Sequence, residues 1–489
     1  MSLNDKLNIF IERLYTNQNN TETEHLKNVY QKENYYKLLE DVMFLLEHYP
    51  NMDMTFYREH LIELSGIKEI IHNFIEERRL TPGMTVSFGT QNNVVKLISG
   101  NKQEVIMENG TYCNQPIEMT EHDIFDLAST SKLFTAISLL KLCEAGLINI
   151  NDPIRKYVPE FENLEDITIF DLMTFQVPVK SEQRIDMATS IQEAEKLIYT
   201  MFREENHNPS FPYTDMGSIT LRFVIEKVSN MPLREFIEEE IIKKYNMTST
   251  FLNVPEELRS YVVNENYSAV VDKDGRILTI KDNIPGTVHD AKTRKLGHSA
   301  GIAPGHAGFF SCADDLQKLA QCIMNKKVLN EEHTLMLGQN VVGKKILYEG
   351  GLHAYNCHHG LLTYAKQADP YFLSTVRPFL SGKAFASPGF TGTSLCVDSL
   401  NGVYTFISSN RLHNRIYTVH PDQRHNIIVH DNRSREFVSP FTGETKIIAS
   451  SYAHDSAEIT EIAMKLALEF KFLEEILEQK NELKLVRYI

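Results

Sequence analysis

The chain has 489 residues, of which 42% are hydrophobic and 24% are charged, the composition of a globular protein with a full core. Fifty Lys and Arg against 65 Asp and Glu give a net charge of −15, which argues against nucleic-acid binding and against a polybasic membrane anchor. The length predicts one large two-lobed domain or two to three smaller ones.

The sequence also indicates a compartment. Its start lacks the basic residues, unbroken apolar run and small-residue cleavage site of a secretory signal, and no later segment is apolar enough to predict a membrane helix. The six cysteines are scattered and form no Cys-x-x-Cys pair, a pattern typical of reduced thiols. We therefore predict a soluble cytoplasmic protein that binds neither membrane nor nucleic acid.

Residues 1–65 carry helical spacing with almost no Gly or Pro, interrupted at Pro50-Asn51. We expect a helical extension that packs on the rest of the chain or provides a partner surface, for example for homo-oligomers. Its residues suggest no chemistry.

Residues 66–489 predict an α+β domain. Short strands are expected over 84–88 and 94–98, a hairpin over 395–408, and a helical lobe over roughly 140–300. A last long helix is predicted to begin at Asp455. Strands at both ends of a helical middle predict one antiparallel sheet completed by both ends of the chain.

The most informative segment is Ser129-Thr130-Ser131-Lys132, at the start of a predicted helix that ends at Gly146. A serine hydroxyl needs a base to become a nucleophile, and a lysine three residues later lies on the same helical face. The spacing alone is weak evidence, because Ser65, Ser99 and Ser138 are also followed by lysine three residues on. Ser129 is also a plausible helix N-cap.

Five segments together are more specific. Residues 125–135 resemble the nucleophile motif of the serine β-lactamase and penicillin-binding protein superfamily, closest to class C β-lactamases and their esterase relatives. Tyr213-Thr214-Asp215 resembles the family's Tyr-x-Asn motif with Asp in place of Asn, and 386–393 resembles its His-Thr-Gly-Phe-Thr-Gly-Thr segment. Segments 288–290 and 305–311 match its Val-His-Asp and Gly-His-Ala-Gly stretches.

The resemblance implies a role for each matched residue. Ser129 would be the acylated nucleophile, with Lys132 as base or proton relay and Tyr213 as the partner base. The backbone N–H groups of Ser129 and Phe390 would form the oxyanion hole, and Gly389 would let its strand approach the substrate. Asp215 would hydrogen-bond Lys132 or the substrate. Its charge would raise the Lys132 pKa, so that Tyr213 would have to act as the base.

The third motif departs from the family pattern, because Ser387 and Pro388 replace its first two residues. A substrate carboxylate there would lose a charge-assisted contact worth roughly 1.5–3 kcal/mol. The site therefore looks poorly suited to β-lactams and terminal D-amino acids, and better suited to neutral esters or amides. His306 is a candidate for the missing cation, although a structural role at its Gly-rich turn is equally consistent, and Lys383 is another.

These observations predict a β-lactamase/transpeptidase-like fold and a serine hydrolase that uses an acyl-enzyme, favouring an esterase or amidase on small acyl substrates. A D-stereospecific peptidase or weak β-lactamase is one alternative, and a degenerate member that binds a ligand or partner without turnover is another. No cofactor or metal is expected, because the cluster His353, Cys357, His358 and His359 fits no zinc pattern. The loops around 180–210 and 345–385 are expected to shape the pocket.

Overall fold

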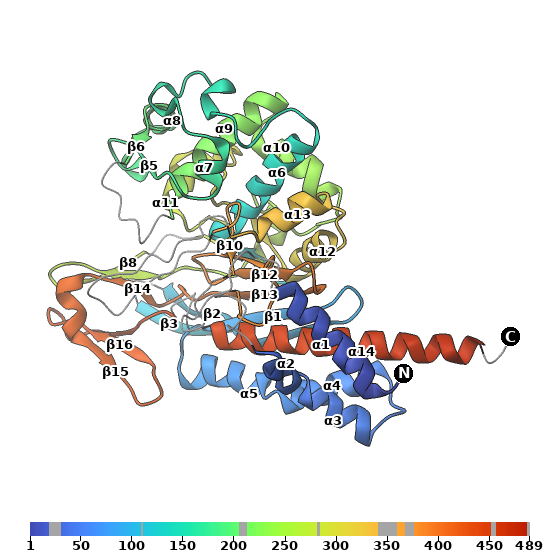
Figure 1. The fold of residues 1–489 in the computed structure, drawn as a ribbon. Helices are drawn as coiled ribbons and strands as arrows, with labels where there is room; N and C mark the ends of the chain where they lie inside the picture. The colour runs from blue at the N-terminus through green and yellow to red at the C-terminus, as the bar shows by residue number, and fades with distance from the viewer. Residues whose placement is uncertain are drawn as a thin grey trace.

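The computed structural model describes residues 1–18, 31–108, 111–204, 213–280, 284–340, 359–366, 376–450 and 456–486. Its centre is a seven-stranded antiparallel sheet with the order β10-β11-β12-β13-β1-β2-β3 (Figure 1). The strands are β1 Gly83–Gly89, β2 Val94–Glu108, β3 Thr111–Glu118, β10 Tyr364–Ala365, β11 Phe385–Pro388, β12 Ser394–Asp398 and β13 Val403–Ser409.

Strands from the two ends of the chain meet in the middle of this sheet. β1 pairs with β13 from Met84 opposite Ser409 to Gly89 opposite Tyr404. β12 and β13 form the predicted hairpin, and Gly402 takes the positive φ of 69° that its turn requires. The α+β class and the predicted completion of the sheet by both ends of the chain are confirmed.

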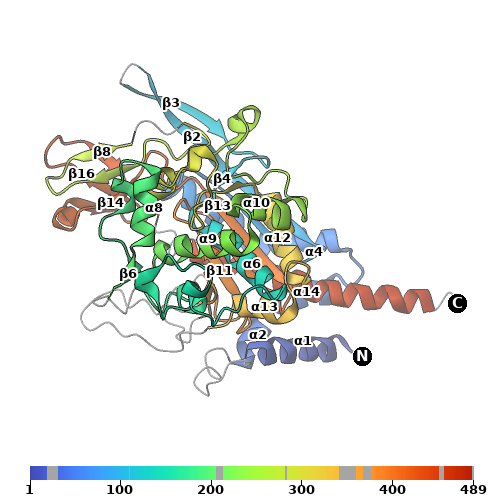
Figure 2. The same ribbon diagram turned by 90° about the horizontal axis from the view of Figure 1, so that it is seen from above.

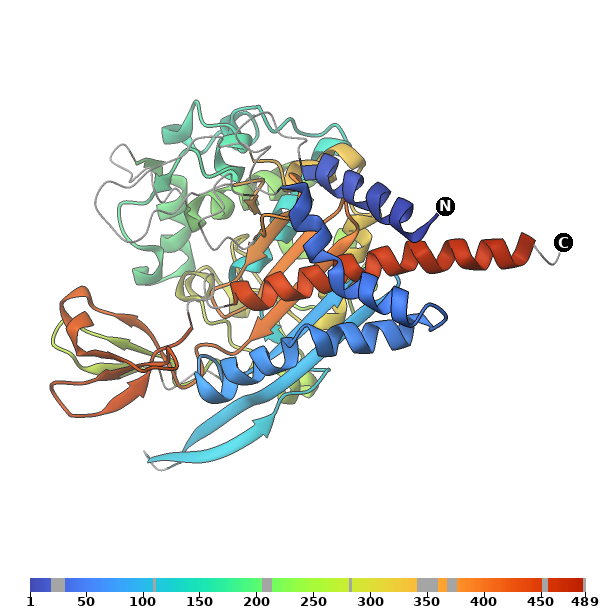
Figure 3. The same cartoon turned by 60° about the horizontal axis from the view of Figure 1, so that its bottom comes forward.

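One face of the sheet is covered by α14, which lies across β1 and β13, and by the N-terminal helices beside it (Figure 3). The ring centroids of Phe10 and Phe472 lie 5.0 Å apart, so these helices and α14 share one hydrophobic core with the sheet. The predicted start of the last helix at Asp455 lies outside the described residues. The helices of this layer are α1 Leu3–Gln18, α2 Lys32–Leu38, α3 Glu40–His48, α4 Met54–Leu64, α5 Ile67–His72, the π-helical turn Asn73–Glu77 and α14 Ala457–Val486.

The helical lobe covers the opposite face. Its central helix, α6, is buried nearly all round and lies beside α9 (Figure 2), while α12 packs on β12, β13 and β1. The lobe's helices are α6 Lys132–Glu144, α7 Ile169–Met173, α8 Ile191–Tyr199, α9 Asp215–Ser229, α10 Leu233–Ile237 with the π-helical turn Glu238–Lys243, α11 Ala291–Lys295, α12 Ala313–Met324 and α13 Glu331–Leu337.

In the described residues, short strands make four smaller sheets. Two of them form a projection at one end of the molecule, which contains a polar stretch with His420, His425 and His430 (Figure 3). The sets are β14 Ile416–Val419 with β7 Ala269–Val271 and β8 Ile277–Thr279; β15 Ile427–Val429 with β16 Arg435–Val438 and β17 Thr445–Ile447; β4 Phe125–Asp126 with β9 Phe310–Ser311; and β5 Val179–Lys180 with β6 Phe202–Arg203.

Candidate active site

Ser129 lies in a strained turn between β4 and α6. The turn Ala128–Ser131 is 3₁₀-helical, so the α-helix begins at Lys132 and not at Ser129. Ala128 has a φ of 43°, a left-handed conformation that costs a non-glycine residue about 1–2 kcal/mol. The buried carboxylate of Asp126 accepts the N–H of Ala128 at 2.8 Å and the N–H of His289 at 2.7 Å, which holds the turn in place.

Three side chains form a closed hydrogen-bonded triangle. Lys132 Nζ lies 2.9 Å from Ser129 Oγ and 2.7 Å from the Tyr213 hydroxyl, and that hydroxyl donates to Ser129 Oγ at 2.8 Å. Lys132 is only 1% exposed, although it is charged in its ordinary state. This arrangement brings together the three residues that the sequence predicts for nucleophile and base.

Aromatic rings fix the orientation of Tyr213. Its ring centroid lies 4.9 Å from that of Phe175 and 6.1 Å from that of Tyr364 on β10. His359 packs against the rings of Phe175 and Tyr364 at 4.8 and 5.0 Å and is fully buried. His359 is thus a core histidine, and the other members of its predicted cluster lie outside the described residues.

Asp215 binds Lys132. It is the first residue of α9, after the N-cap Thr214, and its Oδ1 lies 2.8 Å from Lys132 Nζ. Burial acts to raise the pKa of Asp215, but the positive charges of Lys132, His306 and Lys292 outweigh burial and hold that pKa well below its usual range. Asp215 is therefore an anion beside the buried Lys132 Nζ.

The third motif packs tightly on the nucleophile turn. Thr130 Oγ1 donates to the carbonyl of Ser387 at 2.9 Å, and Thr393 Oγ1 donates to the carbonyl of Leu127 at 3.0 Å. A Cβ on Gly389 would lie 2.2 Å from Thr393 Oγ1 and 2.4 Å from the Leu127 carbonyl oxygen. Glycine is required here by the approach of β11 to the serine turn, an approach that the sequence analysis did not include.

Ser387 supplies no charge at this motif. Its side chain is 2% exposed, and its hydroxyl lies 3.5 Å from the Thr130 carbonyl. Phe390 follows in the same segment, where its carbonyl accepts a hydrogen bond from Arg411 and its ring lies 4.9 Å from the Arg411 guanidinium. Lys383 precedes Ser387 by four residues and lies in a turn before β11 begins at Phe385.

A family model described as Beta-lactamase matches residues 73–427, which include the whole triangle and the third motif. The chain belongs to the beta-lactamase family.

Curated relatives of this family member include proteins named "Putative D-alanyl-D-alanine carboxypeptidase". The protein of Salmonella enteritidis PT4 is 25% identical over 338 residues, covering 63% of this chain and 74% of the relative. The protein of Escherichia coli K12 is 24% identical over 331 residues, covering 62% of this chain and 72% of the relative.

Solved structures with the same fold include three distant neighbours. An octameric penicillin-binding protein homologue from Pyrococcus abyssi has a TM-score of 0.52 at 18% identity, covering 71% of this chain and 73% of its own. The simvastatin synthase LovD of Aspergillus terreus has a TM-score of 0.54 at 14% identity, and the match covers 83% of this chain and 98% of LovD. EstCE1, a hydrolase with promiscuous acyltransferase activity, has a TM-score of 0.53 at 14% identity, and the match covers 83% of this chain and 99% of EstCE1. These likenesses show the fold, and the family match places the protein in the serine hydrolase superfamily of β-lactamases and penicillin-binding proteins.

This beta-lactamase family member has a second lysine at the site that the sequence analysis missed. Lys292 Nζ on α11 lies 2.8 Å from Asp215 Oδ2 and 3.7 Å from Asp290 Oδ2. Burial lowers the pKa of Lys292, but the two carboxylates outweigh it and raise that pKa above its usual value. Its position two residues after the matched Val-His-Asp segment was the available signal.

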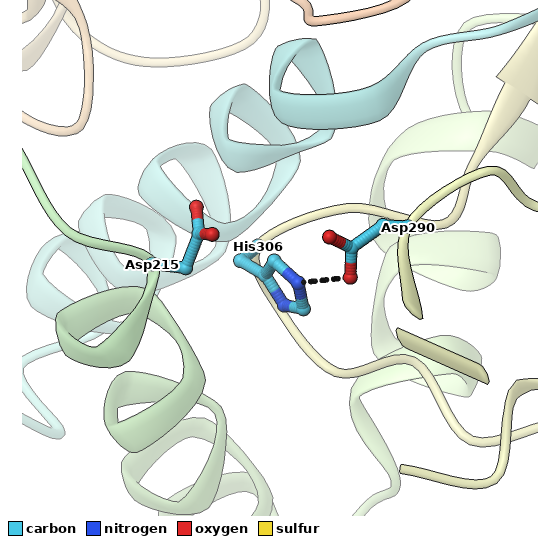
Figure 4. Close-up of side chains that lie close together, drawn as sticks. All are labelled: Asp215, Asp290 and His306. Atoms are coloured by element: carbon cyan, nitrogen blue, oxygen red, sulfur yellow. Dashed lines mark hydrogen bonds and ion pairs between the residues drawn. The ribbon is translucent and has the colours of Figure 1, made fainter. Parts of the chain in front are cut away.

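His306 faces Asp290. Its Nε2 lies 2.9 Å from Asp290 Oδ1 and 3.2 Å from Thr293 Oγ1, as Figure 4 shows for the carboxylate, and the side chain is 1% exposed. Its backbone carbonyl accepts a hydrogen bond from Lys132 Nζ at 3.2 Å. His306 thus contacts Lys132 through its backbone carbonyl, and its ring, the candidate for the missing cation, is paired with a carboxylate.

The cluster of Asp215, Asp290 and His306 has the residue types of a metal site, with one possible ligand atom from each within 4.8 Å of the others (Figure 4). However, each oxygen of Asp215 already lies 2.8 Å from a lysine ammonium. These two cations compensate the carboxylate charge that would attract a metal ion. The donor set does not fit a metal, and we derive no chemistry from one.

A separate cavity of about 700 Å³ opens between α9, α10 and residues 300–303. Its cations are already paired, because Arg222 Nε lies 2.9 Å from Glu226 and Arg234 Nε lies 2.7 Å from Glu238. None of the candidate catalytic residues lines it.

In the described part of the chain, no helix combines the length and apolar character needed to cross a membrane.

Proposed function

We propose that this protein is an esterase or amidase that transfers small acyl groups to Ser129 and then to water. The observation that carries the proposal is the triangle of Ser129, Lys132 and Tyr213, with its three distances between 2.7 and 2.9 Å. A hydroxyl within hydrogen-bond reach of two possible proton acceptors is the arrangement that an activated serine requires.

In the first step, Ser129 Oγ forms a bond to the substrate carbonyl carbon while its proton passes to the Lys132–Tyr213 pair. The backbone N–H groups of Ser129 and Phe390 are the proposed donors to the oxyanion. The proton then moves to the leaving alcohol or amine as the carbon–leaving-group bond breaks. Water attacks the acyl-enzyme by the same steps in reverse, releasing the acid and restoring Ser129.

The third motif supports a neutral acyl substrate. A cation for a substrate carboxylate is missing at Ser387 and Pro388, and His306 is paired with Asp290. EstCE1 is a hydrolase with acyltransferase activity and LovD is a synthase, which is consistent with ester chemistry on this fold. The names of the curated relatives favour the alternative, a D-stereospecific carboxypeptidase.

The deciding experiment is intact mass after incubation with a fluorophosphonate probe and, separately, with short-chain p-nitrophenyl esters, penicillins and peptides ending in D-Ala-D-Ala. Wild type is compared with Ser129→Ala and with Ser138→Ala. Ser138 is the matched control, because it has the same spacing to a lysine but lies buried in α6 and donates to the Phe134 carbonyl.

We expect one adduct in wild type and Ser138→Ala, none in Ser129→Ala, and turnover of esters well above that of penicillins or D-Ala peptides. Faster turnover of the peptides would support the carboxypeptidase. Folded protein that forms no adduct with any reagent would support the non-catalytic binder.

Two further expectations belong to this proposal. The five described cysteines are free thiols, which supports the predicted cytoplasmic location. The N-terminal helices expose Ile9, Phe44 and Leu64 by 58%, 50% and 54%, which supports assembly through these helices. The Pyrococcus abyssi neighbour is itself an octamer.

A further inference from the structure

The Asp215 carboxylate joins two lysines. Its Oδ1 lies 2.8 Å from Lys132 Nζ and its Oδ2 lies 2.8 Å from Lys292 Nζ. The three groups come from α6, α9 and α11, so only the tertiary structure brings them together. The side chains of Lys292 and Asp215 are 29% and 21% exposed, which leaves their charges only partly screened by water.

Other charged and titratable groups surround this bridge. Asp290 lies beside Lys292 and caps α11 by accepting the Thr293 N–H at 2.7 Å. His306 approaches from the segment before β9 and binds Asp290. Asp186, from the neighbouring 3₁₀ turn Ile185–Met187, is paired with Arg184 at 2.5 Å, and this pairing and the more distant charge of Lys292 act to lower the pKa of Asp186. The two carboxylates that face Lys292 at the site, Asp215 and Asp290, therefore lie among Lys132, Lys292 and His306.

Asp215 creates a chemical difficulty that Lys292 relieves. The reaction requires the Lys132–Tyr213 pair to accept the Ser129 proton, so this pair must first lose one proton. An unpaired carboxylate 2.8 Å from Lys132 would favour the protonated pair. A second ammonium on the same carboxylate opposes that effect, whichever of Lys132 and Tyr213 holds the proton.

We propose that Lys292 is a positioning residue that holds Asp215 and lowers the pH at which the Lys132–Tyr213 pair can accept the proton of Ser129. The inference rests on the proposed function and deepens it. Lys292 would offset the negative charge of Asp215, which stands where the family motif has an uncharged Asn. This role requires no contact between Lys292 and the substrate.

The test measures the rate constant for fluorophosphonate labelling of Ser129 by intact mass from pH 5.5 to 10. The variants are Lys292→Gln, Lys292→Arg and Asp215→Asn, with Lys295→Gln as the matched control because Lys295 is exposed on the same helix. Thermal melts establish that each variant is folded. This probe needs no knowledge of the natural substrate.

We expect Lys292→Gln to move the midpoint of the pH–rate profile upward by about one pH unit, with roughly tenfold slower labelling near neutral pH and recovery at high pH. Lys292→Arg keeps the charge and should stay close to wild type. Asp215→Asn should move the midpoint downward, and Lys295→Gln should leave it unchanged. Should Lys292→Gln fail to fold, the Arg and Asn variants decide the question.

A uniform loss of rate in Lys292→Gln with an unchanged midpoint would overturn the inference, because a merely structural role predicts that result. An upward shift in Lys292→Arg as large as in Lys292→Gln, or no downward shift in Asp215→Asn, would also overturn it. All three results leave the serine hydrolase proposal standing, since Ser129 is still labelled. Absence of labelling in folded wild type would instead remove the proposed function, and this inference with it.

Discussion

Tyr213 combines a rigid ring with a hydroxyl that is shared by two polar atoms. Phe175 and Tyr364 hold the ring, while the hydroxyl contacts Lys132 Nζ and Ser129 Oγ. The ring therefore places the oxygen without help from the hydrogen bonds. Removal of the oxygen alone should separate chemistry from packing.

We predict that Tyr213→Phe lowers kcat/KM for a p-nitrophenyl ester by about 10²–10⁴-fold, the usual contribution of a general acid–base group. The melting temperature should change little, because every ring contact is kept. Steady-state kinetics and a thermal melt on the same preparation measure both effects. Wild-type kinetics in the variant would exclude Tyr213 from the proton transfer.

Gly389 controls how closely β11 approaches the nucleophile turn. An added methyl would meet the backbone carbonyl of Leu127 at 2.4 Å, and backbone cannot move as a side-chain end can. We predict that Gly389→Ala destabilises the protein by about 2–4 kcal/mol and abolishes Ser129 labelling.

Gly146→Ala is the comparison variant, since its Cβ would meet nothing within 4 Å and only its φ of 69° opposes the change. It should cost about 1 kcal/mol and keep full labelling. Urea denaturation and intact mass distinguish the two glycines. Equal effects at both positions would contradict the proposed close packing.

Helix α14 carries a buried charge network that joins the terminal helices. Lys465 Nζ lies 2.6 Å from Asp41 on α3 and 3.6 Å from Glu469 Oε1, and Glu469 is 1% exposed. Burial raises the pKa of Glu469 to about 8, and Lys465 offsets only part of that rise. The folded protein thus holds a proton on Glu469 at neutral pH that the unfolded chain releases.

This proton makes stability depend on pH with a defined sign. Between the ordinary Glu pKa near 4.5 and about 8, the folded state binds more protons, so stability falls as pH rises, by at most about 1.4 kcal/mol per unit. We predict that Glu469→Gln flattens this slope and is more stable than wild type at pH 8 by about 2–4 kcal/mol. Denaturation midpoints at pH 5 and 8 measure the difference, with the exposed Glu478→Gln as control. A slope unchanged from wild type would show that Glu469 ionises normally.

At the scale of the whole molecule, the exposed apolar residues of the N-terminal helices predict assembly. Phe44→Glu together with Leu64→Glu should convert an oligomer to a monomer in size-exclusion chromatography with light scattering, because charges at a buried interface are costly. Leu278→Glu, at a 48% exposed site on the distant β8, is the control and should leave the mass unchanged. A monomeric wild type would contradict the predicted oligomer.

The whole fold also determines where the site is built. Ser129 and Lys132 begin the central helix, Tyr213 and Asp215 begin α9, and Gly389 follows a strand near the far end of the chain. The sheet supplies one wall of the site and the helical lobe the other, so residues separated by as many as 260 positions share it.

The sequence by itself determined the fold class, the hairpin over 395–408 and, with the family resemblance, the three residues of the triangle. The strands, the Asn401-Gly402 turn and the lysine one helical turn after Ser129 depend on local spacing. Tyr213 was identified by its match to a family motif. The Asp in the Tyr motif and the missing cation at Ser387 were equally visible, because they are identities at matched positions.

The tertiary structure alone decided the contacts between distant segments. Spacing could not show that Lys292 reaches Asp215, that His306 faces Asp290, or that Gly389 is required by the Leu127 carbonyl. It also could not show that the N-terminal helices share a core with α14. Each of these depends on how helices and strands pack in three dimensions, and packing places charges and close approaches between residues that no local pattern relates.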